Sequence, residues 1–248
     1  MDIIHIAVLL GILAFFAHIV KGLTGFGPAI VFVSIGSVIH DPVEVIVLSS
    51  LLDIIGGSYL LFLNPNFLKN RKYWLTLGLL MVAGAVTGGM ILSMITADVF
   101  EYLLGGSIIV IGLWFLIGEY EPGESSDIYD RLGFLDGTVA AFSGLSGGLT
   151  GMGGPPLIAY LGAKFEKDMF RSLIVPVFLM AAIARFFTYG FLGMVQASDP
   201  WLYVFPPIGV ILGNRLGDHF FEEVEQEWFT VIIGLILLLS GIRLISGG

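Results

Sequence analysis

The stretch Leu-Thr-Gly-Phe-Gly-Pro at residues 23–28 occurs a second time, as Leu-Thr-Gly-Met-Gly-Gly-Pro at residues 149–155. Each copy follows a hydrophobic run that suits a helix and precedes a short apolar segment that opens with proline. Glycine weakens a helix, and proline lacks the N–H that a helix interior requires. Each copy therefore predicts a break between two helices, and the repetition predicts an internal duplication of the chain.

The composition predicts a membrane protein. Of the 248 residues, 56% are hydrophobic and 12% are charged, whereas soluble domains carry roughly 25% charged residues. Apolar runs long enough to cross a bilayer recur along most of the chain. We therefore expect an all-α polytopic protein that crosses the plasma membrane several times. The first apolar run is long for a signal peptide and no basic residue precedes it, so it is expected to remain in the mature protein.

The same composition narrows the kinds of site to expect. The chain has no cysteine and only four scattered histidines, so neither a metal centre nor a cofactor is expected. A formal net charge of −9 argues against nucleic acid as a partner. The expected partners are a small anionic substrate and the lipid bilayer, and a homodimer is one possible assembly.

Ten apolar segments can be marked, and most approach the roughly 20 residues that a spanning helix needs. They cover residues 3–20, 28–39, 43–63, 73–95, 99–118, 132–149, 155–163, 172–195, 201–217 and 228–246. The second and the seventh are too short to span, and each directly follows a glycine break. An acidic linker at 119–131 then separates a first membrane repeat at 1–118 from a second at 132–248. In the fourth segment of each repeat, the stretch from Gly84 to Gly88 resembles the stretch from Gly209 to Gly213. Glycines four residues apart are typical of close helix packing.

Basic residues near segment ends predict the orientation of the chain. Two clusters are assigned to the cytoplasm, namely Lys69, Arg71 and Lys72 in the first repeat and Lys164, Lys167 and Arg171 in the second. Counting crossings from these clusters places both termini outside and the linker inside. The two repeats then have opposite orientations, as in many secondary transporters. Whether the segments flanking each break span the membrane or form re-entrant hairpins stays open.

The two breaks are candidates for an anion site. Short helices are expected to begin at Pro28 and Pro155, because proline suits the first turn of a helix. First-turn amides have no partner within their helix and carry the positive end of its dipole, and glycine lets a ligand approach them, so the combination binds anions. In inverted repeats the two breaks would converge near the midplane. The alternative is that each Gly-Pro pair only kinks a helix.

The candidate substrate-binding residues lie in the two breaks, with one further residue in the eighth segment. They are Thr24, Gly25, Phe26, Gly27, Pro28, Thr150, Gly151, Met152, Gly153, Gly154, Pro155 and Arg185.

Two ionisable residues lie in the middle of apolar segments, where charge is costly and suggests function. Arg185 could hold an anion through paired hydrogen bonds, and Asp53 could be a coupling carboxylate that exchanges protons. Alternatively, the two could form a buried ion pair that joins the repeats. Lys21 precedes the first break and is either a cytoplasmic anchor or a cation near the midplane. Asp136 lies near the start of its segment and is expected at the interface.

At the two breaks the sequence resembles the sulfite/sulfoacetate exporter family TauE/SafE. The matching stretches are residues 22–28 and residues 147–156, of which the second is the closer match. The first copy has Phe26 and a single glycine before its proline, so the two half-sites are expected to differ. The resemblance implies two related modules and the export of small sulfur-containing anions such as sulfite or organosulfonates.

These observations favour a secondary transporter that works by alternating access around a midplane anion site. A channel, or a transporter for other small anions such as carboxylates, is the alternative, because helix N-termini suit those anions nearly as well. An intramembrane enzyme lacks support, since the apolar segments contain neither paired catalytic carboxylates nor a histidine–carboxylate metal spacing.

Overall fold

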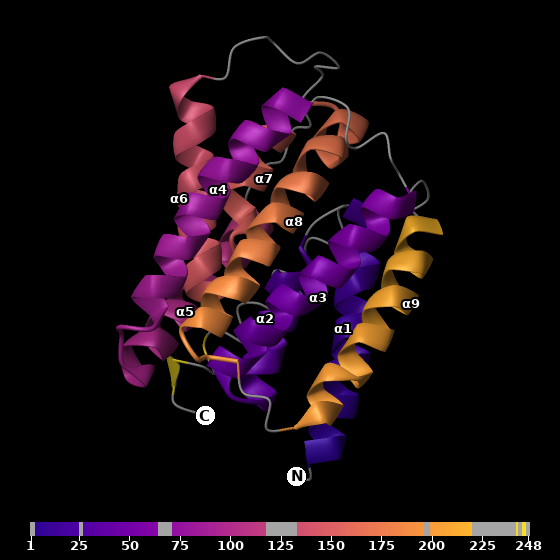
Figure 1. The fold of residues 1–248 in the computed structure, drawn as a ribbon, viewed down its shortest axis with the longest axis vertical. Coiled ribbons are helices and arrows are strands. Elements are labelled where there is room, and N and C mark those ends of the chain that lie inside the picture. The colour runs from indigo at the N-terminus through magenta and orange to yellow at the C-terminus, as the bar shows by residue number, and fades with distance from the viewer. Residues whose placement is uncertain are drawn as a thin grey trace.

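The computed structural model describes residues 3–24, 27–63, 71–117, 133–195 and 199–219, together with residues 242, 245 and 246. Within these ranges every element of secondary structure is a helix (Figure 1). The elements are α1 (Ile3–Thr24), α2 (Pro28–Ile39), α3 (Pro42–Leu63), α4 (Arg71–Leu92), α5 (Ala97–Ile117), α6 (Phe134–Thr150), α7 (Gly154–Gly162), α8 (Lys167–Phe191), a 3₁₀ turn (Pro200–Tyr203) and α9 (Phe205–His219).

The predicted segments agree closely with these helices, and the all-α prediction is confirmed for the described residues. Two starts differ. The eighth helix begins at Lys167 rather than at residue 172, and α9 begins at Phe205 rather than at residue 201. The second difference arises because Asp199 accepts a hydrogen bond from the amide of Trp201 at 3.0 Å and caps the 3₁₀ turn instead.

Several sequence predictions fall outside the described residues. These are the linker at 119–131, most of the tenth segment at 228–246, the basic residue Lys69, and Gly25 and Phe26 of the first break. The side chain of Thr24 is also outside the described part.

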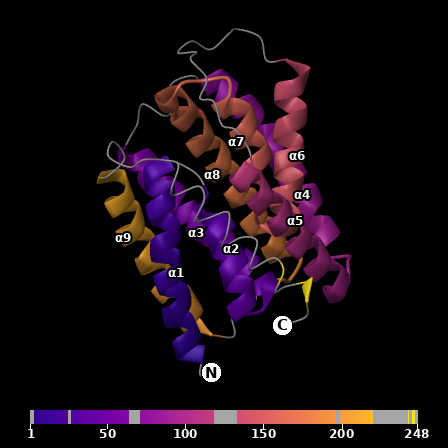
Figure 2. The ribbon, with the colours of Figure 1, turned by 180° about the vertical axis from the view of Figure 1, so that it is seen from behind.

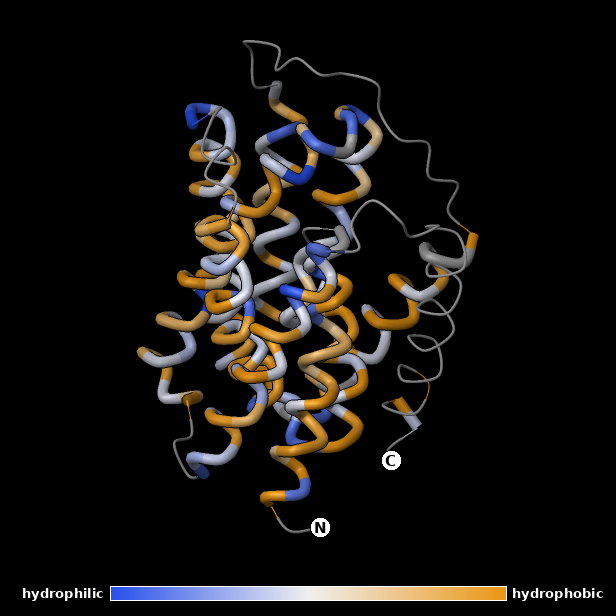
Figure 3. Tube along the Cα trace, turned by 90° about the vertical axis from the view of Figure 1, so that its right-hand side faces the viewer, coloured by the Kyte–Doolittle hydropathy of each residue, from blue (hydrophilic) through white to orange (hydrophobic). Residues whose placement is uncertain are grey.

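Four of the described helices are long and apolar enough to cross a membrane. They are Ile3–Gly22 within α1, Pro42–Leu63, Arg71–Leu92 and Asp168–Phe191 within α8. In Figure 3, hydrophobic residues prevail along the helices, whereas hydrophilic residues gather near the top and bottom and at a few positions at mid-height. Large apolar side chains such as Phe16, Phe187 and Val110 are exposed on the outside, which suits contact with lipid.

Glycines allow two helix pairs to pack backbone against backbone. Helix α1 lies beside α9 and α4 lies beside α6 (Figures 1 and 2). A Cβ atom added at any of eight glycines in these pairs would overlap a carbonyl oxygen of the neighbouring helix: Gly22, Gly84, Gly88, Gly144, Gly148, Gly209, Gly213 and Gly217. Small residues at such spacing are typical of close contacts between membrane helices.

We expect Gly84→Ala to lower the unfolding temperature, because its Cβ would overlap the Ala141 carbonyl oxygen and lie 2.7 Å from the Leu145 amide nitrogen. Overpacking of this kind costs about 1–3 kcal/mol. Gly106→Ala is the matched control, since a Cβ there has nothing within 4 Å. Thermal unfolding in detergent should separate the two variants. Equal unfolding temperatures would contradict the role given to Gly84.

Two polar networks lie at the helix ends near the two basic clusters, and the first corrects a prediction. Asp136 is only 2% exposed rather than interfacial, and its carboxylate accepts hydrogen bonds from Tyr73 at 2.7 Å, Tyr160 at 3.1 Å and Lys164 at 2.9 Å. Its burial is possible because these partners, from α4 and from α7 with the turn that follows it, supply the donors that a carboxylate requires.

Arg171, a member of the second basic cluster, is 6% exposed within α8. It donates to the Asp218 carboxylate of α9 at 2.6 Å and to the Gly22 carbonyl of α1 at 2.8 Å. Burial is tolerated because a carboxylate and a carbonyl replace water around the guanidinium. Arg171 therefore ties α8 to both α1 and α9.

Candidate functional site

Both glycine breaks have the geometry that separates two helices. Gly27 (φ 88°) and Gly151 (φ 77°) adopt left-handed conformations that other residues rarely take. Gly151 ends α6 by donating its N–H to the Gly147 carbonyl at 2.9 Å. Helix α2 begins at Pro28 as predicted, and α7 begins at Gly154, one residue before the predicted Pro155.

The two breaks meet at one cavity. Its lining contains Gly27 and Pro28 of the first break and the run from Gly151 to Gly154 of the second. Its empty volume, including the part open to solvent, is about 490 Å³. The remaining wall is mostly apolar and comes from α2, α4, α6 and α8, with Ile30, Met81, Ala85, Gly144, Gly147, Phe178 and Ala181 among its residues.

Three charged side chains, Lys21, Asp53 and Arg185, line this cavity. The Asp53 carboxylate accepts from the Lys21 ammonium at 3.0 Å and from the Arg185 guanidinium at 2.9 Å. The side chains of Lys21, Asp53 and Arg185 are 4%, 13% and 7% exposed, so the cluster is largely shielded from water. The predicted alternative of a buried Asp53–Arg185 ion pair is thus present in the structure, and it includes Lys21 as a third member.

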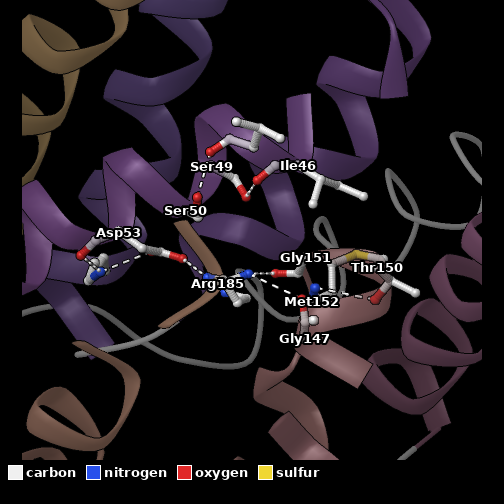
Figure 4. A network of polar contacts seen from close by, with 12 residues as sticks. Ile46, Ser49, Ser50, Asp53, Gly147, Thr150, Gly151, Met152 and Arg185 are labelled. Carbon is white, nitrogen blue, oxygen red and sulfur yellow. Dashed lines mark hydrogen bonds and ion pairs between the residues drawn. The ribbon is translucent and has the colours of Figure 1, made fainter. Parts of the chain in front are cut away.

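Arg185 also contacts the second break directly. One nitrogen of its guanidinium donates to the Gly151 carbonyl at 2.8 Å and to the Gly147 carbonyl at 3.4 Å. Figure 4 shows Arg185 between Asp53 on one side and the carbonyls that end α6 on the other. A cation is favourable at this position, because the C-terminal end of a helix carries partial negative charge.

The number of first-turn amides available at each break is smaller than the sequence suggested. In α7, Pro155 and Pro156 have no N–H, and the Leu157 amide donates to the Ser143 hydroxyl at 3.3 Å. Among the described residues, this leaves the amide of Gly154 in that first turn. Ser143 of α6 lies 14 positions before Leu157 in the chain, so no local sequence pattern could have indicated this contact.

The first break has a similar arrangement. Pro28 has no N–H, and the Ile30 amide donates to the Gly27 carbonyl at 3.1 Å, which leaves the amide of Ala29 among the described residues of that turn. Ala29 and Gly154 both line the cavity. Each break thus contributes to the cavity lining one residue whose first-turn amide has no partner among the described contacts.

The structure brings together some of the predicted site residues but not all of them. Gly27, Pro28, Gly151, Met152, Gly153, Gly154 and Arg185 line the cavity, as does Asp53. Thr150 and Pro155 are not part of its lining. The Thr150 hydroxyl instead donates to the Ser146 carbonyl at 2.9 Å and accepts from the Met152 amide at 3.3 Å, so it supports the turn.

Lys21 is the charged cavity residue that sequence reasoning did not assign to the site. The sequence left it open between a cytoplasmic anchor and a cation near the midplane, and the structure buries it beside Asp53. The signal in the sequence was Asp53, in the middle of α3, because a buried carboxylate requires a cation nearby. The sequence could not tell which helices pack together and hence which cation that would be.

Comparison with known proteins gives one family match. The family described as Sulfite exporter TauE/SafE matches residues 10–244, nearly the whole chain. No curated protein and no solved structure gave a match. The family match covers both breaks, all the described helices from the middle of α1 onward, and the charged cluster of the cavity. The chain therefore belongs to the TauE/SafE family of sulfite exporters.

Proposed function

We propose that this protein exports small sulfur-containing anions, such as sulfite or organosulfonates, by alternating access around the cavity at the two breaks. The family match establishes a membrane transporter of sulfur anions as the general class. The observation that carries the finer proposal is the meeting of both breaks with Lys21 and Arg185 in one shielded cavity. Two cations and two helix N-termini are the groups that stabilise an oxyanion away from water.

The contacts between helices support two inverted repeats. Helix α1 runs upward from the N-terminus in Figure 1, whereas α6 begins at the top of the view and runs downward. The pairing of α1 with α9 then corresponds to that of α6 with α4, and the pairing of α1 with α2 corresponds to that of α6 with α7. Helices α3 and α8, which hold Asp53 and Arg185, pack against each other and would correspond to one another.

Alternating access requires a site that each side can reach in turn, and inverted repeats supply it. Two structurally equivalent halves of opposite direction can exchange conformations, which opens the central site first to one side and then to the other. The sequence contains no phosphate-binding loop for ATP. The driving force is then an ion gradient or the gradient of the anion itself, with Asp53 as the coupling carboxylate.

A channel with the same architecture is the second candidate, and small carboxylates are alternative solutes. Helix N-termini bind carboxylates as well as sulfonates, so the cavity alone does not select sulfur. Electrical recording separates the mechanisms, because a channel current rises with voltage without early saturation, whereas a carrier flux saturates with substrate. We further propose a location in the plasma membrane and assembly as a homodimer.

Proteoliposomes that contain the purified chain should move labelled sulfite or an organosulfonate faster than empty vesicles do. The flux should saturate with concentration, because a carrier binds its solute before each conformational change. Labelled acetate in the same vesicles tests the carboxylate alternative. Equal rates in protein-containing and empty vesicles for every anion would overturn the transport proposal.

A further inference from the structure

The charged cluster of the cavity has one more positive than negative charge. Asp53 is held at hydrogen-bond distance by the Lys21 ammonium and the Arg185 guanidinium, which marks it as an ionised carboxylate. No other charged residue belongs to the described lining. The cluster therefore carries a single net positive charge in a space bounded mainly by apolar side chains.

The two cations keep some donor capacity beyond Asp53. An ammonium has three N–H groups and a guanidinium has five. Lys21 directs two of its N–H groups at the carbonyl and carboxylate of Asp53. Arg185 uses one for the Asp53 carboxylate and shares others with the carbonyls of Gly147 and Gly151. Within the described partners, both cations can therefore donate to an added oxyanion without releasing Asp53.

We propose that Asp53 sets the charge of the transported anion, so that the cavity accepts a monovalent anion in preference to a divalent one. The inference rests on the proposed anion site and specifies the substrate class of that site. A monovalent alkyl sulfonate or bisulfite neutralises the cluster. A divalent anion leaves one uncompensated negative charge beside the Asp53 carboxylate, in surroundings where charges interact several times more strongly than in water.

The apolar wall favours the same class of solute. A monovalent organosulfonate has one charged end for Lys21 and Arg185 and a hydrocarbon body for the side of the cavity formed by Met81 and Phe178. A divalent oxyanion has no apolar part, and removing it from water is more costly. Charge and shape together therefore predict tighter binding of a monovalent organosulfonate than of a divalent oxyanion.

The test compares methanesulfonate with sulfate, two tetrahedral sulfur oxyanions that carry one and two charges. Apparent Kd values come from the rise in unfolding temperature of the full-length chain in detergent as each anion is added. Gluconate holds the ionic strength constant. The measurement is made at pH 8, above the ordinary pKa of histidine of about 6.5. The wild-type protein should bind methanesulfonate about tenfold or more tightly than sulfate.

Asp53→Asn raises the net charge of the cluster by one and should shift the affinity ratio toward sulfate by at least about tenfold. Lys21→Gln lowers the charge by one and should shift the ratio the other way, which keeps the test decisive if Asp53→Asn does not fold. Glu44→Gln is the matched control. It removes the same charge from the same helix, nine residues and about 13 Å earlier, outside the cavity lining.

The outcomes separate this inference from the proposed function. Binding of both anions with a ratio that neither Asp53→Asn nor Lys21→Gln changes would overturn the inference and leave the anion site intact. A wild-type preference for sulfate would also overturn it. Failure of both anions to stabilise the wild-type protein would overturn the anion site itself, and the inference with it. A ratio shift of equal size in Glu44→Gln would show a general charge effect and would count against Asp53.

Discussion

Replacing Arg185 with alanine should reduce anion transport about 100-fold or more, because truncating one member of a buried, hydrogen-bonded charge pair costs about 2–5 kcal/mol. Arg185 is the cavity residue that contacts both Asp53 and the carbonyls of the second break. Arg185→Lys should fall between the wild type and Arg185→Ala, since lysine keeps the charge but loses the planar fork. Initial rates in proteoliposomes, corrected for the amount of folded protein, measure the effect.

A structural role for Arg185 predicts a different pattern. If Arg185 only neutralises Asp53 and caps α6, the double variant Asp53→Asn/Arg185→Ala should recover stability and anion binding together, because it removes both charges of the pair. If Arg185 binds the anion, stability recovers and anion binding does not. Arg215→Ala is the control, since Arg215 is an exposed arginine of α9 outside the cavity lining. Unchanged transport by a folded Arg185→Ala variant would assign the residue to structure alone.

The positions of the helix ends at the two breaks could be predicted from the sequence. Proline and glycine act on the backbone where they stand, so the starts of α2 and α7 were found to within one residue. The mid-segment charges Asp53 and Arg185 were also recognisable, because ionised groups in an apolar run need a partner. The proline and glycine signals act locally on the backbone, and the charge signals depend only on whether a residue is buried.

Contacts between distant helices could not be predicted in this way. The burial of Asp136 depends on Tyr73, Tyr160 and Lys164, which reach it from 63, 24 and 28 positions away in the chain. No periodicity within one segment encodes which helix lies beside it. Lys21 is a similar case, since its partner Asp53 belongs to a helix that packs on α1 only in the folded protein.

The glycine stripes show a further limit of sequence comparison. The sequence matched Gly84 with Gly209, but the contacts differ. Gly84 lies against Ala141 and Leu145 of α6. When the two breaks are aligned, Phe15 and Ile19 are the corresponding residues of α1, and the α9 glycine that lies against them is Gly213. A motif that repeats every four residues looks the same after a shift of one turn. Only the packing against the neighbouring helix distinguishes the two registers.

Gly154→Val should block anion binding while the protein still folds, and Gly153→Val should prevent folding. A Cβ at Gly154 would meet only side-chain atoms, the nearest being the flexible end of Ile158 at 2.8 Å. A Cβ at Gly153 would overlap the Ser143 carbonyl oxygen and lie 2.8 Å from the Cα of Gly147, which are backbone atoms that cannot rotate away. The two variants thus test two different requirements: Gly154 leaves space for the anion, and Gly153 allows the break to pack closely against α6.

The expected loss of affinity for Gly154→Val is about tenfold or more, because steric overlap in a packed site costs about 1–3 kcal/mol. The added methyl groups would stand beside the first-turn amide of α7 and near Ile30 of α2, where the two short helices face one cavity. Thermal unfolding in detergent establishes that the variant is folded, and the stabilisation by methanesulfonate measures its affinity. If Gly154→Val folds and binds methanesulfonate as tightly as the wild type, the anion does not bind at the second break, and the cavity between the breaks is not the transport site.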